Sequence, residues 1–156
     1  MQNGRFINYE TAIKKLEKYC SIQERCRHDV IIKLKKLNFF KKNDQIINYL
    51  VSNNFINEER FTLLYCNGKF SVKKWGRIKI SYHLKQKGID NIYILKSIKK
   101  IPEKKYIETM IDLITKKTKA IKEEDSYKKN CAIARYLMQK GFETDLIWKL
   151  INKNSK

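Results

Sequence analysis

The stretch ISYHLKQKGI, residues 80–89, has the features of a helix that ends at a defined point. Ile80 and Leu84 are four residues apart, so they lie on the same face of a helix. Gly88 follows them, and glycine tolerates the positive φ that often ends a helix. Ile89 then covers the end with an apolar side chain. The stretch therefore predicts an α-helix that packs through Ile80 and Leu84 and stops at Gly88.

The same pattern occurs once before this stretch and once after it. The corresponding apolar residues are Val30, Ile80 and Ile133, then Leu34, Leu84 and Leu137; the stops are Asn38, Gly88 and Gly141, followed by Phe39, Ile89 and Phe142. The leucines at positions 34, 84 and 137 are spaced by 50 and 53 residues. Such a period fits a repeated three-helix unit.

Apolar residues recur at helical spacing along almost the whole chain of 156 residues, which holds one proline and five glycines. An all-β fold needs more turns than these residues allow. The sequence therefore predicts an all-α fold of nine helices and no sheet, in three tandem three-helix repeats. We place the repeats at residues 8–55, 56–100 and 101–156. Neighbouring repeats should share apolar faces, which gives an elongated, curved molecule.

Several helix ends are predicted from capping residues. Residues 21–24, Ser-Ile-Gln-Glu, fit a capping box at the start of the second helix. Asn57 fits the N-cap of the fourth helix, which we expect to end near residues 67–68. The fifth helix should run from about Lys73 to Lys87.

The chain is strongly basic, with 35 Lys and Arg residues against 16 Asp and Glu residues and a formal net charge of +19. A charge of this size favours a polyanionic partner. No apolar stretch approaches the roughly 20 residues of a membrane span. The first residues also lack the apolar core of a secretory signal. We therefore expect a cytoplasmic protein that does not bind membranes.

The four cysteines give no metal-site pattern. Cys20, Cys26 and His28 lie close in sequence, but their spacing matches no common set of zinc ligands. Cys26 falls instead on an apolar stripe, which indicates packing in the core. We expect no bound metal and no other cofactor.

A catalytic site is not expected either. The chain has two histidines, His28 and His83, and both are predicted to face the surface without a convincing partner. Residues 68–71, Gly-Lys-Phe-Ser, superficially resemble a phosphate-binding loop, but Leu63 stands where its first glycine is needed. The acidic residues are scattered rather than clustered for metal binding. The sequence therefore predicts a binding protein rather than an enzyme.

Two segments carry a resemblance to a known family. Residues 73–80, Lys-Lys-Trp-Gly-Arg-Ile-Lys-Ile, continuing to residues 84–89, Leu-Lys-Gln-Lys-Gly-Ile, closely resemble the central motif of RecX proteins. Residues 55–61, Phe-Ile-Asn-Glu-Glu-Arg-Phe, are similar to the family signature ahead of it. Motifs of the first repeat follow one RecX subgroup, so the resemblance covers about residues 9–150.

The resemblance implies an activity that composition could not indicate. RecX proteins bind the recombinase RecA, particularly its filament on DNA, and restrain strand exchange and co-protease activity. It implies that this chain is a RecA regulator, with the RecA filament and single- or double-stranded DNA as partners and a monomer as its state. A general DNA-binding protein, such as a helix-turn-helix repressor, is the alternative. A repressor should show one recognition helix and a dimer face, whereas the basic residues here are spread over three similar units.

Candidate binding residues gather around the predicted start of the fifth helix, where free amide groups also favour anions. They are Lys69, Lys73, Lys74, Trp75, Arg77, Lys79 and Lys85. Lysine and arginine can neutralise phosphates, and Trp75 and Phe70 are candidates for stacking on bases. Packing between repeats is the alternative role for Trp75. The expected structural residues are Asn57, Arg60, Phe61, Leu84 and Gly88, with Arg60 bridging helices at a repeat junction.

Overall fold

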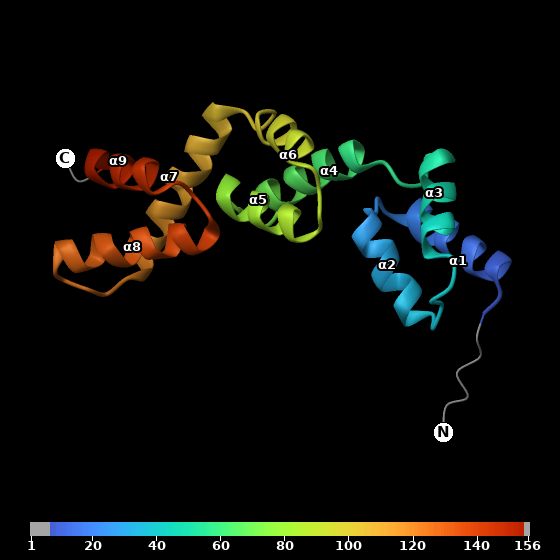
Figure 1. Ribbon diagram of the computed structural model, residues 1–156. Coiled ribbons are helices and arrows are strands. Elements are labelled where there is room, and N and C mark those ends of the chain that lie inside the picture. The colour runs from blue at the N-terminus through green and yellow to red at the C-terminus, as the bar shows by residue number, and fades with distance from the viewer. Residues whose placement is uncertain (1–6, 155–156) are drawn as a thin grey trace, which may run out of the picture.

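The computed structural model describes residues 7–154, and within this range it consists of nine helices and no strand (Figure 1). Their bounds are α1 Tyr9–Ile22, α2 Arg27–Lys36, α3 Asn43–Ser52, α4 Glu58–Ser71, α5 Arg77–Gln86, α6 Asn91–Ile98, α7 Glu103–Ala120, α8 Ser126–Lys140 and α9 Thr144–Asn154. Figure 1 shows α1–α3, α4–α6 and α7–α9 following one another in a row. The all-α helical-repeat fold predicted from the sequence is confirmed.

The three helix stops have the same backbone structure. Asn38, Gly88 and Gly141 have φ values of 55°, 71° and 86°, in the left-handed region. The N–H groups of Phe39, Ile89 and Phe142 donate to the carbonyls of Leu34, Leu84 and Leu137, at 3.0, 3.1 and 3.2 Å. All three leucines are fully buried. The repeated pattern in the sequence therefore corresponds to a repeated helix end that turns the chain back over its core.

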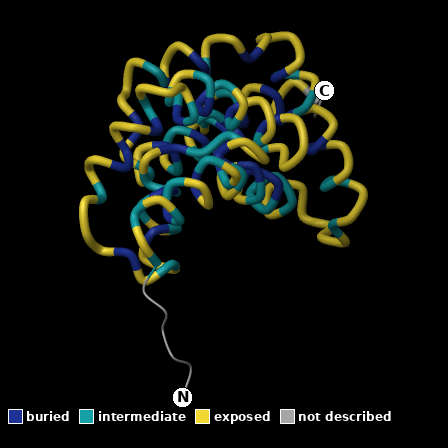
Figure 2. Tube along the Cα trace, turned by 90° about the vertical axis from the view of Figure 1, so that its right-hand side faces the viewer, coloured by how far each residue is buried: buried dark blue, intermediate teal, exposed yellow. Residues whose placement is uncertain are grey.

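The buried side chains form two clusters. One lies within α1–α3 and extends to Ile56, and the other is built mainly from α4–α9. In Figure 2 the exposed residues follow the outer turns of the helices, and buried residues lie toward the interior. The second and third groups of helices therefore share one core, and Cys26, which precedes α2, belongs to it as well. The repeat boundaries at residues 55/56 and 100/101 stay a prediction.

The predicted capping box at residues 21–24 is wrong. α1 continues through Ser21, whose hydroxyl donates to the carbonyl of Glu17 at 2.7 Å within the helix. The N-cap of α2 is Cys26, and its N–H donates to a carboxylate oxygen of Asp29 at 3.3 Å. The predicted box had Glu24 accepting from the N–H of the N-cap residue. In the structure Asp29 accepts from the N–H of Cys26 instead.

Two further helix ends differ from the prediction. α4 continues through residues 67–68 to Ser71, because Gly68 is not among the residues with positive φ. The left-handed residue after α4 is Lys74, with a φ of 54°. α5 consequently begins at Arg77 and not at Lys73.

One of the expected structural residues, Arg60, joins the first two groups of helices, and Asn57 and Phe61 fix the start of α4. The side-chain oxygen of Asn57 accepts from the N–H of Arg60 at 2.9 Å, which confirms its role as a cap. The guanidinium of Arg60 donates to Glu24 at 2.5 Å and to the carbonyl of Asn54 at 3.1 Å. Phe61 is buried in the larger core. The predicted bridging role of Arg60 is confirmed.

A second ion pair, between Asp29 and Lys87, spans the same junction at 2.6 Å. The two side chains are 13 % and 25 % exposed, so water screens the pair only weakly. Burial by itself would raise the pKa of Asp29, but the Lys87 ammonium and the Cys26 donors outweigh it and lower that pKa. A carboxyl whose pKa is lower in the folded state stabilises the fold above its unfolded pKa, and this contribution disappears as pH falls through the folded value.

Replacing Lys87 with methionine should therefore reduce the free energy of unfolding at neutral pH by about 1.5–3 kcal/mol. Urea denaturation measures it directly. The difference between parent and variant should shrink as pH falls through the folded pKa of Asp29, which lies below the usual value of an aspartate. An equal difference at neutral and acidic pH would show that the charge of Asp29 is not involved.

Candidate functional site

The connection between α4 and α5 carries most of the candidate binding residues. The N–H groups of Lys74 and Trp75 donate to the carbonyls of Phe70 and Lys69, both at 3.1 Å, and close the end of α4. This turn leaves Lys73 and Lys74 exposed.

Trp75 is surrounded by the protein itself. Its ring centroid lies 4.7 Å from that of His83 in a stacked arrangement. The ammonium groups of Lys69 and Lys79 lie 4.9 and 4.8 Å from the same ring. The indole also packs against the core shared by α4–α9. The geometry favours the packing role that the sequence left open for Trp75, and the ring holds the two lysines beside each other.

Two expectations about aromatic and histidine side chains are wrong. Phe70 is 4 % exposed and stacks on Tyr106, so its ring cannot stack on a base. His28 and His83 are half-buried rather than surface-facing. His83 also has a partner, because its ring stacks on Trp75.

The amide groups at the start of α5 are occupied. Gly76 N–H donates to the carbonyl of Lys140 at 2.8 Å, and Ile78 N–H donates to that of Gly141 at 3.0 Å. The N–H of Arg77 donates to the Tyr106 hydroxyl at 3.0 Å. The expected anion site on free amides is therefore wrong, because the C-terminal end of α8 fills it.

The side chain of Arg77 is also engaged within the protein. It pairs with Glu103 and, at 3.4 Å, with Glu143, and its guanidinium carbon lies 3.9 Å from the Tyr106 ring centroid. Burial, followed by the hydrogen bond that the hydroxyl donates to Glu143, raises the pKa of Tyr106. Arg77 thus joins α5 to the third group of helices, and we leave it out of the surface proposed below.

The remaining lysines form what we call the cationic face. Its members are Lys69, Lys73, Lys74, Lys79, Lys85 and Lys140. Among the described residues, none of the six has a carboxylate within 4.0 Å. Residues 60–89 contain no Asp or Glu at all. Among the described residues, the aromatic rings and backbone carbonyls near these lysines leave their positive charge unneutralised, which favours an anionic partner.

Sequence reasoning missed two members of this region. Lys140 approaches from α8, and its ammonium lies 3.4 Å from the carbonyl of Lys73. Its position directly before the Gly141 stop, equivalent to Lys87 before Gly88, was the available signal. Tyr82 is 60 % exposed on α5, on the opposite face from Leu84, and lies three residues before Lys85. Unlike Phe70, it is an aromatic side chain exposed to solvent.

The rest of the described chain offers little for catalysis. Burial raises the pKa of the Cys20 and Cys26 thiols to about 11 and that of Cys66 to about 12, so these thiols stay protonated at neutral pH. Cys26 is fully buried, as expected. Within residues 7–154, no three His, Cys, Asp or Glu side chains come together as metal ligands. None of the helices in this range has the length and apolar character needed to cross a membrane.

The fold and the cationic face define an all-helical tandem-repeat protein with a strongly basic surface. A family model described as "RecX, second three-helix domain" matches residues 57–94, and one described as "RecX, third three-helix domain" matches residues 104–151. Together they cover more than half of the sequence. The chain belongs to the RecX family, whose curated members are named regulatory proteins.

Individual relatives agree with this assignment. The regulatory protein RecX of Clostridium beijerinckii is 29 % identical over 147 residues, which cover 92 % of this chain and 66 % of that protein. The RecX protein of Bacillus thuringiensis is 26 % identical over 103 residues, 66 % of this chain but only 38 % of that longer protein. This chain therefore matches less than half the length of the Bacillus relatives.

Solved structures show the same fold. The crystal structure of RecX from Lactobacillus salivarius is similar with a TM-score of 0.79 and 25 % identity, over 92 % of this chain and 94 % of that one. A second structure, of a regulatory protein RecX, gives a TM-score of 0.83 at 21 % identity, over 92 % of this chain and 71 % of that chain.

Proposed function

We propose that this protein binds RecA filaments on DNA and restrains their recombinase and co-protease activities, as a cytoplasmic monomer that performs no chemistry of its own. Membership of the RecX family supports the RecA partner. The observation that carries the DNA contact is the cationic face, whose lysines have no carboxylate partners among the described residues. A net charge of +19 also opposes self-association.

The direct test is RecA-driven ATP hydrolysis on single-stranded DNA. Adding this protein should lower the rate, because a filament that is blocked or disassembled hydrolyses less ATP. A rate that stays constant at every concentration of this protein, with tight binding to duplex DNA alone, would contradict the proposal. That result would support the general DNA-binding alternative.

The cationic face makes a quantitative prediction about salt. Each lysine that neutralises a phosphate of single-stranded DNA contributes a slope of about −0.7 to log affinity against log salt concentration. Replacing Lys73 and Lys74 with alanine should therefore flatten the slope by about 1.4 and weaken inhibition of RecA. Fluorescence anisotropy with labelled DNA over a salt series gives the slope.

The matched control replaces Lys14 and Lys15, two exposed lysines of α1, and changes the net charge by the same amount. This control should leave the slope nearly unchanged, since α1 lies in the first group of helices. If the Lys73 and Lys74 variant inhibits RecA as well as the parent at low and high salt, the DNA contact lies on the first or third repeat.

A further inference from the structure

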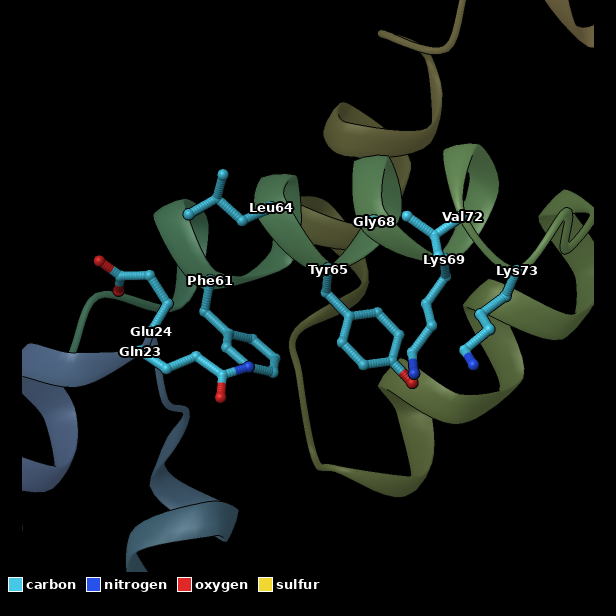
Figure 3. Close-up of a pocket in the computed structure, with 9 residues that line it drawn as sticks. All are labelled: Gln23, Glu24, Phe61, Leu64, Tyr65, Gly68, Lys69, Val72 and Lys73. Carbon is cyan, nitrogen blue, oxygen red and sulfur yellow. The ribbon is translucent and has the colours of Figure 1, made fainter.

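A second surface adjoins the cationic face and shares Lys69 and Lys73 with it, but it also has exposed apolar side chains. We call it the α4 groove, and it is lined by Gln23, Glu24, Phe61, Leu64, Tyr65, Gly68, Lys69, Val72 and Lys73 (Figure 3). In Figure 3 Tyr65 and Lys69 extend to one side of α4 and Leu64 to the other, with Gly68 between them. Gln23 and Glu24 directly follow α1 and lie beside Phe61, at the opposite end of the groove from Lys69 and Lys73.

Two exposed residues of this groove, Leu64 and Val72, are apolar. Leu64 is 53 % exposed and Val72 is 73 % exposed. Helical spacing places Leu64, Gly68 and Val72 in one row along α4. Their apolar side chains stand in water in one row beside the lysines of the groove, an arrangement that suits a partner with both apolar and charged groups.

Gly68 indicates how closely that molecule approaches. It lies inside α4 with no positive φ, so its backbone does not require glycine. A Cβ atom at this position would meet nothing within 4 Å, so packing within the protein does not require it either. Glycine inside a helix costs about 0.5–1 kcal/mol relative to alanine. Close approach of a partner's backbone explains a glycine here, because any side chain would hold the partner away.

The charge of the groove selects the partner. The Glu24 carboxylate pairs with Arg60, whereas Lys69 and Lys73 have no carboxylate partner among the residues described. The net charge at the Lys69 end is therefore positive, which favours an acidic partner and disfavours a second copy of this basic chain. Aliphatic side chains contribute little to binding a nucleic-acid backbone, so the apolar row points to protein.

We propose that the α4 groove docks an acidic amphipathic segment of the protein partner, with small or apolar residues against Leu64, Gly68 and Val72 and a carboxylate near Lys69 and Lys73. This inference rests on the proposed function, in which that partner is RecA. It places the protein partner along α4 and the DNA around α5, and Lys69 and Lys73, which belong to both the groove and the cationic face, lie where the two surfaces meet.

The test is Gly68→Leu, measured for binding to RecA filaments on single-stranded DNA and, separately, to single-stranded DNA alone. The added side chain meets open space and removes a helix glycine, so the free energy of unfolding should not fall. Binding to the filament should weaken roughly tenfold or more, with unchanged affinity for free DNA. Val72→Asn should act in the same direction. Ile92→Asn, which changes an apolar residue of α6 that is 66 % exposed, is the matched control and should bind like the parent.

Each result decides between the two proposals. If the parent binds filaments and Gly68→Leu binds them equally well, the groove inference is wrong and the proposed function stands. If Gly68→Leu loses affinity for free DNA to the same extent, the groove contacts DNA and the inference is again overturned. If the parent does not bind filaments at all, the proposed function fails, and the groove inference fails with it.

Discussion

Replacing Leu84 with alanine should lower the free energy of unfolding by about 2–5 kcal/mol, as for other fully buried leucines. Leu84 lies on α5 and is 0 % exposed within the core shared by α4–α9. Its carbonyl also accepts the Ile89 N–H that closes the helix stop. Alanine leaves a cavity there, and close packing on all sides limits how far the neighbours can collapse into it.

Leu95→Ala is the matched control. Leu95 lies on α6, in the same group of helices, but is 51 % exposed. Its loss should change stability by no more than about 0.5 kcal/mol. Thermal or urea denaturation followed by circular dichroism measures both variants. An unchanged midpoint for Leu84→Ala would show that Leu84 is not part of the core.

The burial of Leu84 could be predicted from the sequence because the pattern that shows it is local. Ile80 and Leu84 share a helix face, and Gly88 marks the stop, all within nine residues. The stops at Asn38 and Gly141 were predictable for the same reason, and both have positive φ. Local pattern was less reliable at helix starts, since the N-cap of α2 is Cys26, and cysteine is not among the residues that usually cap helices.

The candidate site was only partly predictable because its contacts join distant residues. The sequence grouped Arg77 with the lysines, but Glu103 and Glu143 come from α7 and from the start of α9, and they engage its charge. Lys140 was missed because it approaches Lys73 from a helix that begins more than fifty residues later. Charge counts show how many cations a segment holds, but the fold decides which of them remain unpaired.

The contact between Gly76 and Gly141 is the feature that sequence reasoning could least foresee. Glycine has no side chain, so no apolar pattern records what lies next to it. A Cβ atom on Gly76 would lie 2.1 Å from the Gly141 carbonyl oxygen, and one on Gly141 would lie 2.2 Å from Cβ of Lys79. Both glycines are therefore required for the backbone of α5 to meet the end of α8.

Replacing Gly141 with alanine should accordingly destabilise the protein more than its helix-stop role explains. The left-handed φ of 86° costs an alanine about 1–2 kcal/mol. The clash with Lys79 should add about 1–3 kcal/mol, as for other overpacked sites. Lys79 cannot relieve it by rotating its side chain, because its backbone N and Cα also lie within 3 Å of the added atom, at 2.5 and 2.9 Å.

Gly88→Ala separates these two contributions. Gly88 has a φ of 71°, but a Cβ atom there meets nothing within 4 Å, so only the left-handed cost of about 1–2 kcal/mol applies. Urea denaturation should therefore show a larger loss for Gly141→Ala than for Gly88→Ala, and the difference measures the contact between α5 and α8. Equal losses would mean that α8 moves away from Lys79 at little cost. In that case the hydrogen bonds from Gly76 and Ile78 to α8 would not hold the two groups of helices together, and Lys140 would not be fixed beside Lys73 on the cationic face.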